Sequence, residues 1–327
     1  MNKYAILVAI ASFLIGMIGC DTTEPEGESD FESDFALYFL TDDTLRAYEA
    51  MQQEITELAL EPEPWLSEED IRFYDFSSHC IYLKTDKGDY FESYDEGRFD
   101  LLMDKPFVVV AGGTRYYVGS LHSGALSSSP PGPYMSELDV WFYPRDVMHI
   151  SEAWGEEEDI RSMDQIREAL TVLHLYHGGL DLSLDAVSVI ENADTATVQY
   201  TFTITNDDYD DLLILDPDRM GSARFHYFTN GVNFRQGSAY YYSRYKDVIK
   251  PEPFDSWESE WFTEIKAGES LQRTVQLRGY PRLPAGSYNC YLRFSNPTEI
   301  EREDRYSSGA RYWLGGITSD EIVVVVN

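Results

Sequence analysis

The sequence predicts a chain with two folded parts, an α+β domain followed by an all-β sandwich. Between residues 35 and 179, apolar positions recur at both helical and strand spacing, as in an α+β domain. Between residues 180 and 327, several short alternating runs are separated by turn residues and show almost no helical period. A separate apolar run precedes both parts. The 327 residues are enough for two domains of ordinary size.

Residues 1–19 predict a secretory signal peptide. One positive charge, Lys3, precedes an apolar run of about fifteen residues, which is shorter than the roughly twenty that span a bilayer. The run ends in the motif Met17-Ile18-Gly19-Cys20. This motif resembles the lipobox of bacterial lipoproteins. The resemblance implies cleavage after Gly19, lipidation of Cys20 and acylation of the new amino terminus.

Residues 20–34 predict a lipidated cysteine followed by a disordered tether. The segment is acidic, nearly free of apolar side chains and broken by Pro25 and Gly27. Such a composition buries too little surface to offset the entropy lost on ordering. We therefore expect an extracytoplasmic protein that is anchored in the cell envelope through lipid on Cys20. The periplasmic and the surface-facing alternatives both stay open.

The composition is strongly acidic, with 58 acidic and 25 basic residues and a formal net charge of -33. Nucleic acids and anionic lipid headgroups both require a basic footprint, so the charge argues against either as a partner. We interpret the excess mainly as an adaptation of the whole surface, as in salt-adapted proteins. A cation-binding role is the alternative.

In the first folded part, the order of patterns predicts strands mixed with helices. A strand at 36–40 is followed by helical spacing from residue 42, which ends at Pro62. Gly112-Gly113 joins two strands as a tight hairpin. Ser162 and Gln165 have the spacing of a capping box for a helix that extends through His177. Further strands are expected at 80–83 and 140–143.

In the second folded part, strands are expected at 182–190, 198–204, 212–215, 223–229, 271–277, 287–294 and 321–326. The segments 200–206 (YTFTITN), 267–270 (AGES) and 283–288 (LPAGSY) resemble the strands and turns of exported bacterial immunoglobulin-like domains. The resemblance covers residues 180–327 and implies an immunoglobulin-like sandwich. One member of that group is similar to a proteinase-inhibitor domain.

Two groups of residues are candidates for metal ligands, although neither matches a known metal motif. His174 and His177 would share one face of the predicted helix, but histidine also suits a helix C-terminus because of the helix dipole. A second group is rich in oxygen but lacks the spacing of an EF-hand and is also typical of turns: Asp207, Asp208, Asp210 and Asp211. We therefore predict no metal or cofactor.

An aromatic segment is the main candidate for ligand binding. It consists of Tyr240, Tyr241, Tyr242 and Tyr245, with Trp257 and Trp261 nearby. Tyrosine and tryptophan offer large contact areas at low entropic cost and are enriched in binding surfaces. The alternative is an edge strand that packs these rings inward.

Cys80 and Cys290 both lie in strand-like runs. Export would allow a disulfide between them, whereas two buried free thiols would pack equally well in such strands. Neither belongs to a Cys-x-x-Cys pair, so the sequence does not indicate thiol redox chemistry or a zinc ribbon.

The sequence contains no recognisable catalytic set. It has no Gly-x-Ser-x-Gly nucleophile motif and no glycine-rich phosphate loop. We therefore expect a lipid-anchored envelope protein with a non-enzymatic binding or assembly role, whose partner is a protein or a glycan. One alternative is an envelope or extracellular hydrolase whose N-terminal site combines His149, His174 or His177 with carboxylates. The other is a proteinase-inhibitor-like sandwich.

Overall fold

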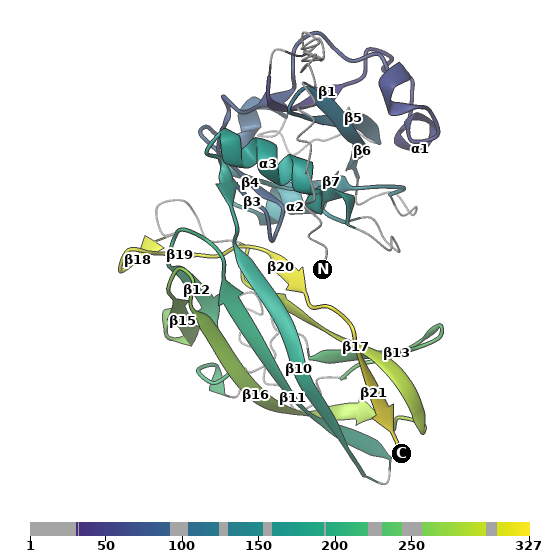
Figure 1. Ribbon diagram of the computed structural model, residues 1–327, viewed down its shortest axis with the longest axis vertical. Coiled ribbons are helices and arrows are strands. Elements are labelled where there is room, and N and C mark those ends of the chain that lie inside the picture. The colour runs from purple at the N-terminus through teal and green to yellow at the C-terminus, as the bar shows by residue number, and fades with distance from the viewer. Residues whose placement is uncertain are drawn as a thin grey trace, which may run out of the picture.

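The computed structural model describes residues 31, 33–91, 104–123, 130–152, 159–192, 194–221, 231–243, 257–298 and 306–327. The signal peptide, Cys20, most of the tether, Tyr245 and the strand expected at 223–229 lie outside these residues. The described part is mostly β and forms several sheets (Figure 1). Its α-helices are short: α1 (Ala47–Ala50), α2 (Glu137–Phe142) and α3 (Asp164–Val172). Within this part, no helix has the length and apolar character needed to cross a membrane.

The first half of the chain contains a mixed sheet in the order β2-β1-β5-β6-β7. Its strands are β1 (Phe35–Phe39), β2 (Leu66–Ser67), β5 (Lys105–Ala111), β6 (Thr114–His122) and β7 (Tyr134–Ser136). The predicted hairpin joins β5 and β6, because Gly112 and Gly113 have φ values of 53° and 72° that suit a tight turn. Apolar side chains on this sheet and on α3 form the core of the first half.

A second sheet in this half, in the order β8-β4-β3-β9, has two different faces. Its strands are β3 (Ile71–Asp75), β4 (Cys80–Leu83), β8 (Val147–His149) and β9 (Tyr176–His177). Side chains alternate along each strand, so Tyr74, Ile81 and Met148 enter the core of the first half. The paired residues Asp75, Cys80, His149 and His177 occupy the opposite face. That face carries the cluster described below.

The second half contains two sheets whose inner faces form a common core. One is β10 (Leu180–Glu191), β11 (Thr195–Asn206) and β16 (Ser270–Pro281), in the order β10-β11-β16. The other has the order β14-β13-β17-β20, with β21 also paired to β17. Its strands are β13 (Val232–Gln236), β14 (Ala239–Tyr241), β17 (Gly286–Ser295), β20 (Gly316–Thr318) and β21 (Ile322–Val326). Tyr200, Phe234 and Tyr288 are among the buried residues between these sheets.

A tyrosine fixes the corner that leads into β17. The Tyr288 side chain is buried, and its hydroxyl donates to the carbonyl oxygen of Pro284 at 2.5 Å. Cys290, two residues further along the strand, is buried in the same core. The turn expected at 284–286 therefore does more than reverse the chain, because it also accepts a hydrogen bond from the strand that follows.

A smaller sheet lies at the end of the second half that faces the first half (Figure 1). Its order is β15-β12-β19-β18, with β12 (Leu212–Leu215), β15 (Phe262–Ile265), β18 (Tyr306–Ser307) and β19 (Ala310–Tyr312). Among the described strands, none pairs across residues 179 and 180. The hydrophobic core nevertheless continues across this point, because Phe73, Cys80 and Tyr82 pack in the same cluster as the second-half residues.

Four local predictions were wrong. The helical spacing from residue 42 gives only α1 and a 3-10 turn at Ile55–Glu57. Met163 is the N-cap of α3 and makes no side-chain cap hydrogen bond, so Ser162 and Gln165 do not form the expected capping box. Most of the strand expected at 140–143 belongs to α2, because Ser136 caps this helix by accepting from the Leu138 amide at 3.1 Å and acidic residues occupy its first turn. The helix expected to reach His177 ends at Val172. His174 then takes a positive φ of 58° and directs the chain into β9, so His174 and His177 do not share a helix face.

Candidate functional site

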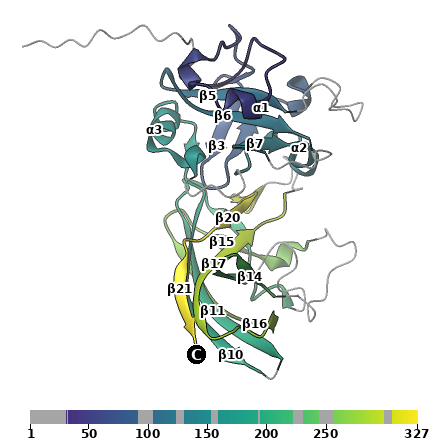
Figure 2. The ribbon, with the colours of Figure 1, turned by 90° about the vertical axis from the view of Figure 1, so that its right-hand side faces the viewer.

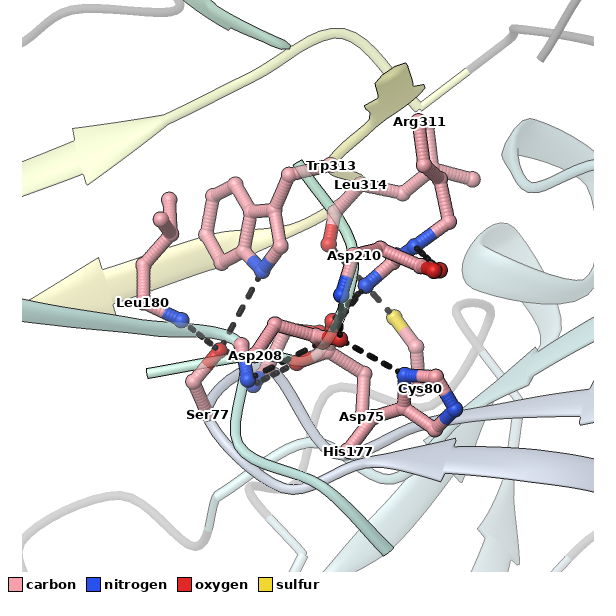
Figure 3. Close-up of polar contacts among 12 residues, drawn as sticks. Asp75, Ser77, Cys80, His177, Leu180, Asp208, Asp210, Arg311, Trp313 and Leu314 are labelled. Carbon is pink, nitrogen blue, oxygen red and sulfur yellow. Dashed lines mark hydrogen bonds and ion pairs between the residues drawn. The ribbon is translucent and has the colours of Figure 1, made fainter. Parts of the chain in front are cut away.

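A group of buried charges joins the two halves of the chain, and we call it the junction cluster. It consists of Asp75 and His177 from the first half and Asp208, Asp210 and Arg311 from the second (Figure 3). The side chains of Asp75, Asp208 and Arg311 are fully inaccessible to solvent. Ionised groups this deep in a protein are costly unless they are paired and hydrogen-bonded.

Arg311, on β19, is the centre of this cluster. Its Nη2 atom lies 2.8 Å from Asp208 Oδ2 and 3.3 Å from Asp75 Oδ2, and its Nη1 atom lies 3.2 Å from the Tyr82 hydroxyl. The guanidinium carbon also lies 5.0 Å from the centre of the Phe73 ring. Arg311 of the second half is thus held by the Asp75 carboxylate and by two aromatic residues of the first half, Phe73 and Tyr82.

Asp208 accepts hydrogen bonds from both halves. His177 Nδ1 lies 2.7 Å from one carboxylate oxygen, and the Gly179 amide donates to the other at 3.2 Å. Burial alone would raise the pKa of Asp208, but the His177 hydrogen bond and the Arg311 charge lower it to about 2. Asp208 therefore stays ionised at neutral pH.

Ser77 and Gly179 position the other side of the cluster. The Ser77 hydroxyl donates to Asp75 at 2.7 Å and accepts from the Leu180 amide at 3.0 Å and from Trp313 Nε1 at 3.2 Å. Gly179 has a φ of 69°, and a Cβ atom there would collide with Ser77 and Asp75. Glycine is therefore required where the chain passes from one half to the other.

Arg311 remains a cation in this environment. Burial lowers its pKa, but the surrounding groups, including Tyr82, Asp75 and Asp208, outweigh this effect and raise it above the ordinary arginine value. The cluster combines three carboxylates with one guanidinium, so it keeps an excess of negative charge beside His177.

The structure brings together three of the six candidate metal ligands. Donor atoms of His177, Asp208 and Asp210 all lie within 4.8 Å of one another. Arg311 already lies against two of them, with its Nε atom 3.4 Å from Asp210. Its guanidinium supplies the positive charge that a metal would supply, so the geometry favours an ion-pair cluster.

The other candidate ligands lie apart from this group. His174 is in the turn after α3, and Asp207 is not among the grouped donors. Asp211 accepts from the Ala267 amide at 3.0 Å and lies 3.3 Å from Lys266 Nζ. It therefore fixes a loop of the second half.

A histidine–carboxylate pair lies at the edge of the same sheet face. His149 Nδ1 is 2.9 Å from Asp139 Oδ2, and the Ser151 hydroxyl donates to that same oxygen at 2.9 Å. This contact assigns the proton of a neutral imidazole to Nδ1, which leaves the Nε2 lone pair available as a base. Ser151 is beside Nδ1, at 3.2 Å, and not beside Nε2. The sequence indicated His149 only as one of several histidines, since Asp139 was assigned to no site.

His79 is a buried histidine with structural contacts on both ring nitrogens. Its Nδ1 lies 3.0 Å from the Tyr74 hydroxyl and its Nε2 lies 3.2 Å from Asp159 Oδ2. Burial, which outweighs the attraction of Asp159, lowers its pKa from 6.5 to about 4. The neutral ring is therefore the form that stabilises the fold.

We expect His79 to make the protein less stable as the pH falls from about 6.5 to about 4. In this window the unfolded chain binds a proton that the folded chain does not, so acidification favours unfolding by up to about 3 kcal/mol. His79→Asn keeps a residue that tolerates the positive φ of 52° and should flatten this part of the profile. Urea unfolding of both proteins from pH 7 to pH 4 measures the difference. If the unfolding free energies of wild type and His79→Asn changed equally with pH, His79 would not be the source of this pH dependence.

The structure divides the aromatic segment into exposed and packed residues. Tyr240 and Tyr242 expose 55% and 58% of their surface. Tyr241 packs edge-on against Tyr288, with ring centres 5.7 Å apart. Trp261 is buried and Trp257 packs against Phe262 and Tyr312. Inward packing therefore applies to Tyr241 and both tryptophans, whereas Tyr240 and Tyr242 remain available for contacts.

Cys80 and Cys290 are both free and buried, so the structure contains the thiols and not the disulfide. Cys80 Sγ lies 3.9 Å from the carbonyl oxygen of Leu314, across the junction, whereas Cys290 lies in the core of the second half. Burial raises the pKa of each thiol to about 12. Both are therefore unreactive packing groups.

A comparison with known proteins identifies no family for this chain. The sequence matches none of the protein-family models, and it has no match among curated proteins. The function must therefore be inferred from the geometry of the described residues.

Proposed function

We propose that this chain is a lipid-anchored protein of the cell envelope that binds another envelope protein and has no catalytic role. The anchor is lipid on Cys20, and residues 21–34 are the tether. The first half is proposed as an α+β domain. The second half is proposed as an immunoglobulin-like sandwich.

Three features support the immunoglobulin-like assignment. The strand orders β10-β11-β16 and β14-β13-β17-β21 correspond to the two sheets of such a sandwich. Tyr288 donates back to Pro284 at the corner before β17, as in the tyrosine corner of these domains. Cys290 follows two residues later, at the position of the second cysteine of antibody domains, but here it is a free thiol.

The observation that carries the proposal is the solvent-facing side of the sheet β14-β13-β17-β21, which we call the outer face. The burial of alternate residues defines its members. They are Asn233, Arg235, Tyr240, Ser287, Asn289, Tyr291, Arg293, Val323 and Val325. Val323 and Val325 expose 69% and 65% of their surface.

The outer face differs from the rest of this acidic protein. Its members include two arginines and no carboxylate, although the chain has 58 acidic residues. Glu321, which precedes β21, is neutralised by Arg235 at 2.8 Å. Protein interfaces are enriched in tyrosine and arginine and depleted in aspartate, glutamate and lysine. The outer face has this composition, which supports a protein partner over a glycan.

The opposite sheet provides an internal comparison. Its solvent-facing positions are mostly threonine, serine and glutamine, and these side chains bond to one another. Thr201 and Thr274 are 2.9 Å apart, and Thr205 and Ser270 are also 2.9 Å apart. Asp185 accepts from Thr203 at 2.7 Å and from Gln272 at 3.1 Å on the same surface. These polar groups satisfy one another, so the surface lacks the exposed tyrosine and arginine anchors of the outer face.

The junction cluster supports the proposal in a different way. Two independent domains joined at residues 179 and 180 could take many relative orientations. Pairing Arg311 with Asp75 selects one orientation, because any other would leave buried charges without partners. The outer face is thereby held at a set position relative to the first half.

Affinity capture from envelope extract tests the proposal, with the soluble form that begins at Asp21 as bait. We expect a specific protein partner that is retained by wild type and lost from the double variant Tyr240→Ala/Arg293→Ala. Thr274→Ala on the opposite sheet should retain it. A partner held equally by all three baits, or a glycan in place of a protein, would refute binding through the outer face.

A hydrolase is the second candidate, and the Asp139–His149 pair is the observation that favours it. An imidazole with an oriented Nδ1 and an available Nε2 can remove a proton from a water molecule that attacks an ester or amide. His149→Asn should then abolish hydrolysis of envelope polymers by the purified protein, whereas Ser162→Ala should not change it. Equal turnover by wild type and His149→Asn would eliminate this candidate.

A further inference from the structure

Strand β21 leaves one edge of its sheet open. In the described part of the chain it forms a ladder with β17 alone, from Gly286↔Val326 to Cys290↔Ile322. The backbone N–H and C=O groups on its other side therefore point away from the sheet. Figure 2 shows β21 at the outer margin of the second half. An edge of this kind is a template for another strand.

The other strands at the margins of these two sheets carry features that discourage strand addition. β10 has a bulge between Leu184 and Ala186 and carries the acids Asp181 and Asp185. β16 carries two arginines and ends at Pro281. β14 and β20 have only three residues each. Bulges, charges, prolines and short length are the usual means by which proteins protect sheet edges.

β21 has none of these features apart from its modest length. Its sequence is Ile322-Val-Val-Val-Val326, which is uncharged and entirely β-branched. Its register with β17 has no irregularity. Such a strand would be an aggregation hazard if it stayed uncovered.

The core is also incompletely covered at the same edge. β10 lies beside β21. Val187 and Val189 on β10, and Ile322 and Val324 on β21, pack against the core but remain only partly buried. An extended strand beside β21 would complete the backbone ladder and cover these four side chains together. A helix could cover the side chains but would leave the backbone edge unpaired.

We propose that β21 is the docking edge for an extended strand donated by another protein of the envelope. This inference rests on the proposed binding function and names its mode. The donated segment would have apolar side chains at alternate positions, no proline in its centre and few acids. A second copy of this chain is a poor donor, because two bodies of net charge -33 repel each other.

Amide hydrogen exchange of β21 tests the mode of binding directly. It is measured on the full chain in native envelope membranes and on the purified chain in detergent. In the purified chain, alternate β21 amides should exchange rapidly, because only every second amide faces β17. In the membranes, the rapid set should slow by about tenfold or more, whereas amides on the margin of β16 should not change.

A matched pair of variants completes the experiment. Val325→Lys places a charge on the exposed side of β21 and should remove the additional protection, whereas Thr274→Lys on the opposite sheet should preserve it. Slow exchange of the amides that face β17 verifies that each variant is folded. The proposal is overturned if the rapid amides stay rapid in membranes or are already slow in the dilute purified chain. Protection that increases with the concentration of the purified chain would also overturn it, since the donor would then be a second copy.

Failure of strand donation is distinguishable from failure of the binding function. If Tyr240→Ala/Arg293→Ala loses the captured partner while β21 gains no protection in membranes, the outer face binds but the edge does not. If that double variant keeps the partner, binding through the outer face is itself wrong.

Discussion

Replacing Arg311 with methionine is expected to lower the free energy of unfolding by about 3–5 kcal/mol. Methionine keeps much of the side-chain volume but removes the cation that lies between the buried carboxylates of Asp75 and Asp208. Most of the destabilisation comes from the two carboxylates, which remain buried away from water without a positive partner. The lost attraction between the charges contributes less. Equilibrium unfolding in urea at pH 7 measures it.

The loss of stability caused by Arg311→Met should become smaller as the pH falls. Burial raises the pKa of Asp208 and the Arg311 charge is one of the interactions that lower it, so we expect the folded-state pKa of Asp208 to rise when Arg311 is replaced. The variant should therefore lose less stability than wild type as acidification protonates this carboxylate. The gap between wild type and Arg311→Met should therefore narrow on acidification.

Arg167 provides a matched control. It also pairs with an aspartate, at 2.6 Å, but both side chains are largely exposed. Arg167→Met should change the unfolding free energy by less than about 1 kcal/mol. If the two arginine variants were equally stable, the junction cluster would not hold the halves together as described.

Replacing Cys20 with alanine should remove the protein from the detergent phase in a phase-partition experiment. The expected effect is nearly complete, because several acyl chains on one residue contribute about 0.8 kcal/mol for each buried methylene group. Cys80→Ala and Cys290→Ala are the matched controls, since both thiols are buried in the folded part. Incorporation of labelled fatty acid should likewise be lost only from the first variant.

An uncleaved signal peptide could keep the Cys20→Ala chain on the membrane without lipid. The mass of the mature amino terminus separates this case from lipidation at another residue. A Cys20→Ala protein that is cleaved, still labelled with fatty acid and still retained would contradict the anchor.

Long strands with one buried side could be predicted from the sequence, whereas the shorter β3 and β13 were missed. The alternation of Val198, Tyr200, Phe202 and Ile204 with polar residues predicted β11, because each apolar side chain faces the core and each polar one faces water. The Gly112-Gly113 turn was likewise predictable, since a two-residue hairpin turn requires positive φ values.

Local patterns misled where a competing local signal or a remote contact decides the outcome. The apolar run at 140–143 favours a strand by composition, but the cap at Ser136 starts a helix there instead. The junction cluster was not predictable as a unit. Asp75 and Arg311 are 236 residues apart, and neither has a local motif that identifies its partner. Asp208 and Asp210 were considered as metal ligands because the arginine that neutralises them is remote in sequence.

The sequence also does not show which tyrosines of the aromatic segment are exposed. Tyr240, Tyr241 and Tyr242 are equivalent in composition, and only the pairing of β13 with β14 shows that Tyr241 faces the core. The acid-poor outer face could not be recognised from the sequence, because its members come from four strands, β13, β14, β17 and β21, that are spread over about a hundred residues of the chain.

Site-specific photocrosslinking in intact cells is the most direct test of the central claim that the outer face binds another protein. A photoreactive residue would replace Tyr240 on the outer face or, as a control, Thr274 on the opposite sheet. We expect one discrete crosslinked protein from position 240 and none from position 274, with the product lost when Arg293→Ala is added. Equal crosslinking from both positions, or none from position 240 in a folded and anchored chain, would contradict it.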